Sequence, residues 1–202
     1  MKIYNTSEPI VNHYINLINA GKKTIKDVPA KFQEEVAELL GISLTELTLE
    51  EVKENKIAEM SAISEKVITN GTDIQLSDGT IKHYSFTSND QANIKNLFDL
   101  AVVTQADGIP YHADDDMCEL YSCADIIAIY IAEQKFILYH NTYFNTLKQY
   151  IKSLTTIEEV EAVVYGQELN AEYAAIMQSI LTQSAEVFAI AMEKYGITVV
   201  TE

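Results

Sequence analysis

ADIIAIYIAEQKFILYHNTYFNTLKQYIKS, residues 124–153, carries the longest helical pattern of the chain. Ile127, Ile131 and Leu138 recur along one side of a helix with 3.6 residues per turn. Leu147 and Ile151 continue the same line. Many further apolar residues widen this stripe, which is typical of a helix that packs against neighbours on more than one side. We therefore expect this helix to lie at the centre of the protein.

Helical patterns also precede and follow this segment. Residues 48–70 have an apolar face, and Lys53 is among the charged side chains that we expect to face water. Ser88 and Gln91 have the spacing of a capping box, so we expect a further helix to begin there. After the central helix, the pattern predicts a short helix ending near Gly166 and an alanine-rich helix over residues 170–195.

The β signal is weaker and local. Ile74 and Leu76 alternate with polar residues, and Asp78-Gly79 is a typical hairpin turn, so residues 72–86 are predicted to form a β-hairpin. Extended segments are predicted at residues 109–112 and 117–121, and a possible strand at 197–200. The predicted fold class is α+β, mainly α: a helical bundle with a small β-hairpin or antiparallel sheet.

The N-terminal region forms a predicted helix-turn-helix segment. Pro9 opens one helix and Pro29 leads a second, while Gly21 and Gly41 suit the helix ends. Two short helices are too small to be stable alone, so they must dock on the rest of the chain or on a partner. We assign residues 1–45 to a docking segment and residues 46–202 to the main α+β domain, with the hairpin at 72–86.

Charge and composition exclude several classes of function. The net charge of −16 opposes binding to phosphate backbones and to anionic membranes. No signal peptide is visible, and no stretch of membrane-spanning length lacks charged or polar interruption. Cys118 and Cys123 are too few for a disulfide framework, so we expect two buried thiols in a reducing cytoplasm. We expect neither a nucleic-acid-binding nor a membrane protein.

No motif indicates catalysis. The sequence has no phosphate-binding glycine loop, no G-x-S-x-G and no H-E-x-x-H. The densest polar cluster could hold a divalent metal, but the glycine and distal glutamate of an EF-hand are missing, which favours a solvated turn. We predict no catalytic, cofactor-binding or metal site, no cofactor and no enzyme; a small metal-dependent enzyme stays as the lower alternative. The cluster consists of His112, Asp114, Asp115, Asp116 and Glu119.

Several motifs occur in order between residues 56 and 169. They include the helix KIAEMSAISEKVITN, the hairpin GTDIQLSDGTIKHYSF, the strand region IPYHADDDMCELY and the helix YHNTYFNTLKQYI. This series resembles a family found in phages and phage-tail-like particles of Gram-positive bacteria, whose members are encoded beside tail-fibre and baseplate genes. Asp115 and Asp116 stand where the resemblance leads us to expect a glycine turn. The resemblance implies no catalytic residues.

The resemblance implies tail-fibre or baseplate proteins as partners. The chain would reside in the bacterial cytoplasm during assembly and then on the tail particle, and a homo-oligomer stays open. Two functions compete: a virion structural protein that stays on the particle, and a tail-fibre assembly chaperone that leaves it. Aromatic side chains are suitable interface anchors. The predicted interaction residues are Tyr14, Ile15, Phe32, Tyr139, Tyr143, Phe144 and Tyr150.

Overall fold

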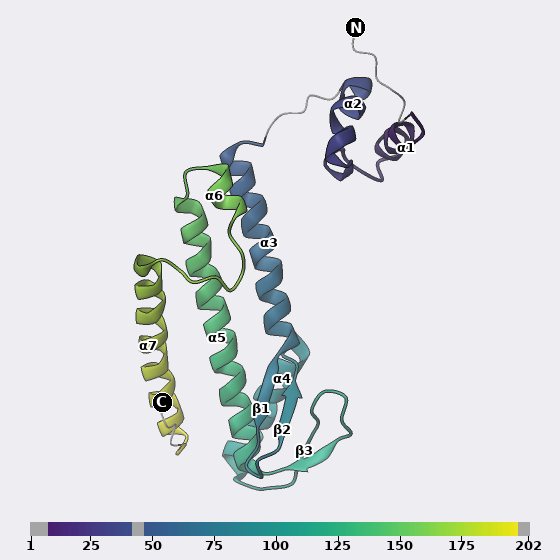
Figure 1. The fold of residues 1–202 in the computed structure, drawn as a ribbon. Coiled ribbons are helices and arrows are strands. Elements are labelled where there is room, and N and C mark those ends of the chain that lie inside the picture. The colour runs from purple at the N-terminus through teal and green to yellow at the C-terminus, as the bar shows by residue number, and fades with distance from the viewer. Residues whose placement is uncertain (1–7, 42–46, 198–202) are drawn as a thin grey trace. The chain divides into compact units, whose positions relative to one another are not determined.

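The computed structural model describes residues 8–41 and 47–197. It is mainly helical with two small antiparallel sheets, which confirms the predicted fold class (Figure 1). The chain divides into two compact units, Met1–Thr48 and Leu49–Glu202. The strand predicted at residues 197–200 lies almost entirely outside the described residues.

The first unit is built on two helices. Helices α1 (Glu8–Asn19) and α2 (Ala30–Leu40) are joined through a 3-10 turn at Ile25–Asp27. Val11, Val28 and Val36 form its small buried core. Gly41 ends α2 in the left-handed conformation, with φ of +66°, which glycine adopts without steric cost.

The second unit is organised around α5. Figure 1 shows α5 running the length of the unit, and α3, α4 and α7 each pack against it, which confirms its predicted central position. The short α6 packs against α3. The helices of this unit are α3 (Leu49–Asn70), α4 (Ser88–Thr104), α5 (Cys123–Ser153), α6 (Ile157–Glu161) and α7 (Ala171–Lys194).

Side-chain caps set where these helices begin. Ser122 caps α5, because its Oγ accepts a hydrogen bond of 3.0 Å from the backbone nitrogen of Asp125. The capping box predicted at Ser88 is wrong by one residue: Thr87 and Asp90 form it instead. The carboxylate of Asp90 accepts hydrogen bonds from both the Thr87 nitrogen and its Oγ1. A charged carboxylate is a stronger acceptor than the Gln91 amide, which favours the Thr87–Asp90 capping box over the one predicted between Ser88 and Gln91.

Two hairpins close one end of the unit. Strand β1 (Thr72–Gln75) pairs with β2 (Ile81–Tyr84), as the sequence predicts, and β3 (Ile109–Tyr111) pairs with β4 (Glu119–Tyr121). The backbone nitrogen of Asp114 donates to the carbonyl oxygen of His83 at 3.0 Å, which joins the second hairpin to the first. The buried core here includes Ile74, Leu76, Tyr84, Phe86, Ile94, Ile109, Tyr121, Ile126 and Ile129.

Gly71 and Asp115 are two of the positions where the backbone is left-handed. Gly71 has φ of +75°, and a Cβ there would lie 1.7 Å from the carbonyl oxygen of Tyr84, so no side chain fits between α3 and β2. Asp115 has φ of +62°. It occupies the turn where the resemblance suggests glycine, and aspartate is one of the few other residues that tolerate this conformation.

Lys53 corrects one prediction. The sequence places it toward water, but it is buried, and its Nζ donates a 2.9 Å hydrogen bond to the carbonyl oxygen of Lys152 at the end of α5. Glu50 lies 3.9 Å from the same nitrogen. Lys53 lies seven residues before the buried Met60 and so shares its helix face. The lysine therefore ties α3 to the C-terminal end of α5.

Candidate functional site

Helix α7 buries only a narrow face. Met177 and Met192 are its buried residues, and the helix packs on α5. Tyr195, just past its end, packs edge to face on Phe98 with ring centroids 5.6 Å apart. Four large apolar side chains of α7 stay exposed, at 46%, 44%, 67% and 55% of their surface: Ile176, Ile180, Val187 and Ile190. We call these four residues the α7 stripe.

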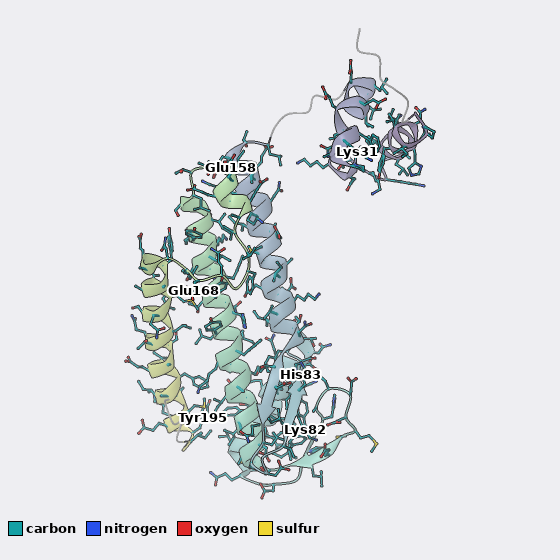
Figure 2. All side chains as sticks on the ribbon, viewed as in Figure 1. Lys31, Lys82, His83, Glu158, Glu168 and Tyr195 are labelled. Carbon is teal, nitrogen blue, oxygen red and sulfur yellow. The ribbon has the colours of Figure 1, made fainter. Side chains whose placement is uncertain are left out.

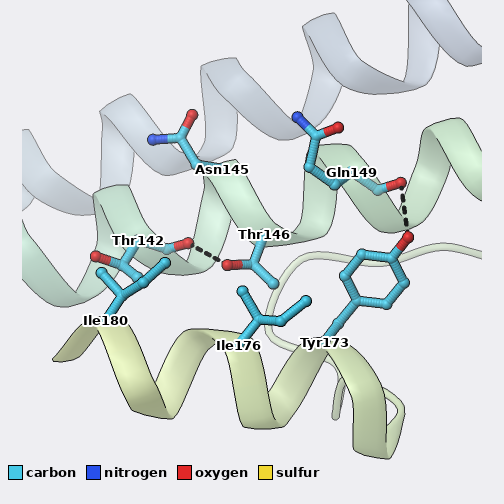
Figure 3. Close-up of a pocket in the computed structure, with 7 residues that line it drawn as sticks. All are labelled: Thr142, Asn145, Thr146, Gln149, Tyr173, Ile176 and Ile180. Carbon is cyan, nitrogen blue, oxygen red and sulfur yellow. Dashed lines mark hydrogen bonds between the residues drawn. The ribbon is translucent and has the colours of Figure 1, made fainter. Parts of the chain in front are cut away.

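One flank of α7 forms an open groove with α5. Figure 3 shows Ile176 and Ile180 facing Thr142 and Thr146 of α5 across it, with the Tyr173 ring beside them. The groove has a volume of about 330 Å³. The Tyr173 hydroxyl donates to the Gln149 carbonyl oxygen at 3.4 Å. The α5 side of this groove consists of Thr142, Asn145, Thr146 and Gln149.

The opposite flank of α7 forms an aromatic groove of about 420 Å³. Tyr139 and His140 of α5 line it together with Tyr165 from the loop after α6. Met177 and Leu181 of α7 form the other wall. Tyr139 is 47% exposed and stacks on Tyr143, with ring centroids 6.5 Å apart. This flank therefore offers an aromatic surface beside α7.

Hydrogen bonds hold the aromatic groove in shape. The Tyr143 hydroxyl donates to the carbonyl oxygen of Gln167 and accepts from the nitrogen of Gly166, both at 2.9 Å. Nδ1 of His140 lies 3.1 Å from the Tyr165 hydroxyl, which donates to Ser64 at 3.2 Å. Burial lowers the pKa of His140 and raises those of both tyrosines. These groups are neutral near pH 7, and their hydrogen bonds position the loop.

The predicted interaction residues lie in different surroundings. Tyr139 is exposed, but Tyr143 is buried and supports the loop. Phe144 and Tyr150 are half-buried, and the ring of Tyr150 packs edge to face on Tyr173. In the first unit, the three predicted residues are half-buried against its core: Tyr14, Ile15 and Phe32.

Sequence reasoning missed the α7 stripe as a candidate site. Its signal was present, because positions 176, 180, 183, 187 and 190 alternate between steps of four and three residues. That spacing is typical of a helix seam that packs on a partner helix. A second series of apolar residues on the adjacent face of α7, which packs on α5, obscures this spacing in the sequence.

Carboxylates of the acidic cluster at residues 112–119 bind other side chains of the protein. Lys82 forms ion pairs with Glu119 and, at 3.1 Å, with Asp116. Asp114 accepts hydrogen bonds from the nitrogen and the Oγ of Ser85. Figure 2 shows Lys82 and His83 at the hairpin end of the unit. Within residues 8–41 and 47–197, no group of three potential metal-binding side chains comes together.

The two cysteines differ from the prediction. Both are free thiols, but Cys118 is exposed and Cys123 is half-buried. The Cys123 sulfur donates to the carbonyl oxygen of Ala101 at 3.4 Å. Cys118 lies directly before β4. The expectation of two buried thiols is therefore wrong for Cys118.

We expect added Ca²⁺, Mn²⁺ or Zn²⁺ to leave the Tm of the protein unchanged relative to EDTA. Asp116 and Glu119 already bind Lys82, and Asp114 already binds Ser85, so a metal ion would have to displace these partners. Differential scanning fluorimetry measures this directly. A rise in Tm that disappears when Asp114, Asp115 and Asp116 are changed to asparagine would instead establish a metal site.

Helix α7 also meets a length-and-composition test for a membrane span. Within the described residues it is the one helix that does so, and only 11% of its most apolar stretch is buried. Core helices of soluble proteins pass the same test. The result is a second sign that α7 carries more apolar surface than its packing on α5 uses.

Comparison with known proteins gives one match. Neither a curated protein nor a solved structure matches the chain. One family model matches residues 51–167, more than half of the chain. The match begins in α3 and ends in the loop after α6, so it contains Tyr139, His140 and Tyr165, while α7 lies beyond it. The chain therefore belongs to the family described as "Domain of unknown function (DUF4376)".

Proposed function

We propose that this protein is a non-enzymatic component of a phage tail or phage-tail-like particle. It attaches at the baseplate or tail fibre through protein–protein contacts, and the α7 stripe is its main contact surface. The observation that carries the proposal is the exposure of Ile176, Ile180, Val187 and Ile190 on a face of α7 next to the face that packs on α5. Several large apolar side chains exposed along one helix face are typical of an interaction site.

The surroundings of α7 support a binding role. Grooves lie on both of its flanks, and each has a wall from α5. The tyrosine hydroxyls and the imidazole of the aromatic groove are used to position the loop of residues 165–169. What the grooves offer a partner is therefore a shaped surface with an exposed aromatic ring, Tyr139.

The tail context rests on the resemblance of residues 56–169 to proteins encoded beside tail-fibre and baseplate genes. The family match over residues 51–167 covers nearly the same stretch. A particle subunit needs rigid and repeatedly used surfaces, and a bundle built around a 31-residue central helix supplies a stiff support.

We expect the double variant Val187→Gln, Ile190→Gln to be depleted from purified particles by about tenfold or more, because each substitution removes roughly 1 kcal/mol of apolar contact. Both positions are largely exposed, so the fold should be unaffected. The measurement is quantitative mass spectrometry of particles from the encoding strain, with the wild-type ratio to baseplate subunits as reference.

The matched control is Leu100→Gln, Val103→Gln on α4. These residues have the same spacing and are also exposed, at 47% and 83%, but lie on another helix. The control should stay on the particles at the wild-type ratio. If the wild-type protein is abundant in the lysate and absent from particles, the structural role is wrong and the assembly-chaperone role replaces it. Equal depletion of both variants would contradict the role of α7.

A further inference from the structure

The α7 stripe has the spacing of a coiled-coil seam. Ile176, Ile180, Val187 and Ile190, with Gln183 between them, alternate in steps of four and three residues. All four apolar residues of this pattern are β-branched. From Ile176 to Ile190 the seam extends about 21 Å at 1.5 Å per residue. Its geometry matches one apolar face of another α-helix.

A groove continues this seam onto α5. Ile176 and Ile180 face Thr142 and Thr146 across the open groove in Figure 3. A helix lying there would contact both α7 and α5, as helices do when they complete a bundle. The polar wall of α5 would limit its apolar contact to one narrow stripe.

The charges beside the seam are acidic. Glu172, Glu186 and Glu193 recur at multiples of seven residues, so they occupy the same position beside the seam, on its side away from α5. All three are exposed, and none forms an ion pair with another described residue. Lys194, at the end of the helix, is the one basic residue of α7.

This charge pattern disfavours a second copy of the chain. In an antiparallel pair of α7 helices, these glutamates would face each other across the seam, and like charges there are destabilising. In a parallel pair they would face the Met177, Ser184 and Ala191 positions, which offer no opposite charge. The whole chain carries a net charge of −16, which further opposes self-association.

We propose that the α7 stripe binds an amphipathic helix of another protein, with an apolar seam flanked by lysine or arginine at the positions that meet Glu172, Glu186 and Glu193. The inference rests on the proposed function, because it names the kind of partner segment that the same surface takes. Charge complementarity beside an apolar seam sets partner choice and orientation in coiled coils.

The test uses the full-length chain and two synthetic peptides of four heptads, both stapled on their outer faces so that they are equally helical. Both peptides have isoleucine and leucine along the seam; one has lysine at the flanking positions and the other has glutamate. Fluorescence anisotropy measures Kd. We expect the lysine peptide to bind about tenfold more tightly, with a preference that weakens in high salt.

Variants of the chain assign this preference to α7. The preference for the lysine peptide should reverse in the triple variant Glu172→Lys, Glu186→Lys, Glu193→Lys. The charge-matched control on α3 and α6 should still prefer the lysine peptide; it is the triple variant Glu54→Lys, Glu65→Lys, Glu161→Lys. Val187→Gln, Ile190→Gln should weaken the binding of both peptides.

Equal binding of the two peptides, or binding of neither, would overturn the inference. The proposed function would still hold if the Val187→Gln, Ile190→Gln variant is depleted from purified particles. The proposed function fails separately, if the wild-type protein is absent from particles. A concentration-dependent dimer in analytical ultracentrifugation that Val187→Gln, Ile190→Gln abolishes would show that the occupant is a second copy. If the protein floats with phosphatidylcholine vesicles, and Val187→Gln, Ile190→Gln abolishes this flotation, the occupant of the α7 stripe is a membrane.

Discussion

Replacing Glu133 by glutamine is expected to remove a pH dependence of stability that the wild-type protein shows between pH 5 and pH 8. Over that range the wild-type free energy of unfolding should fall, relative to the variant, by about 2–3 kcal/mol. At pH 8 the variant should be the more stable of the two. Few single substitutions stabilise a protein by that amount.

The reason lies in the surroundings of Glu133 on α5. Its side chain is fully buried, and Oε1 has no hydrogen-bond partner among the described residues. Oε2 accepts one long hydrogen bond, of 3.3 Å, from the amide of Gln134. Burial raises the pKa of Glu133 to about 7, and the negative charge of Asp90 adds to the shift. The folded state therefore favours the protonated carboxyl.

The sign follows from proton binding. In the unfolded chain this carboxyl titrates near pH 4.5, and in the folded protein near pH 7. Its contribution to stability is therefore present at low pH and is lost progressively as pH rises between these two values. Urea unfolding at several pH values, followed by circular dichroism, measures the difference between the wild-type protein and the variant.

Glu65→Gln is the matched control, because Glu65 is exposed on the neighbouring helix α3. The free energy of unfolding of this variant should change with pH as that of the wild-type protein does between pH 5 and pH 8. A Glu133→Gln curve that also runs parallel to wild type would mean that Glu133 is charged in the folded protein and has a partner that the structure does not contain.

Replacing Asp125 by alanine is expected to destabilise the protein by about 3 kcal/mol at pH 7. Asp125 lies in the first turn of α5 and is 9% exposed. Its carboxylate accepts hydrogen bonds from the Ser77 nitrogen at 2.8 Å and from the Ser122 hydroxyl at 2.6 Å. Alanine would leave the nitrogen of Ser77, in the turn of the first hairpin, without this acceptor.

Asp125 and Glu133 respond to pH in opposite directions. Burial acts to raise the pKa of Asp125, but hydrogen bonds from Ser122 and Ser77 outweigh it and lower the pKa below its usual value. The stability that Asp125 contributes is therefore present above the unfolded pKa and is lost as pH falls through the folded pKa. Acid should therefore weaken the attachment of the first hairpin to α5.

Equilibrium urea unfolding at pH 7 measures the effect of Asp125→Ala. Asp99→Ala removes a carboxylate that is exposed on α4 and pairs with Lys95 four residues away, so its cost should stay below about 1 kcal/mol. If both variants lost the same stability, the contact between Asp125 and Ser77 would not be what holds the hairpin to α5.

Local patterns in the sequence were sufficient to predict the positions of most helices. The apolar periodicity of residues 124–153 and the cap at Ser122 predict α5 to within one residue at its start. Asp78-Gly79 predicts the first hairpin in the same way. These signals are local, because a cap, a turn and a helical stripe each depend on residues only a few positions apart.

Burial was harder to predict, as Lys53 and Tyr143 show. Lys53 is a charged residue that the sequence places in water, yet its Nζ donates to the carbonyl oxygen of Lys152 in the last turn of α5, where carbonyl groups lack partners within the helix. Tyr143 has the composition of an interface anchor, yet the loop of residues 165–169 covers it. Neither partner is near in sequence, so no local pattern could identify them.

The sequence alone established a mainly helical α+β protein with an acidic surface, a central helix and an N-terminal helix pair, because helix periodicity, turn residues and net charge are properties of short segments or of composition. Only the tertiary structure decided which apolar side chains stay exposed. Helix α7 has two apolar series on adjacent faces, and both look alike in sequence. Packing on α5 buries one of them, and the α7 stripe is what remains, because one neighbouring helix can cover only one face.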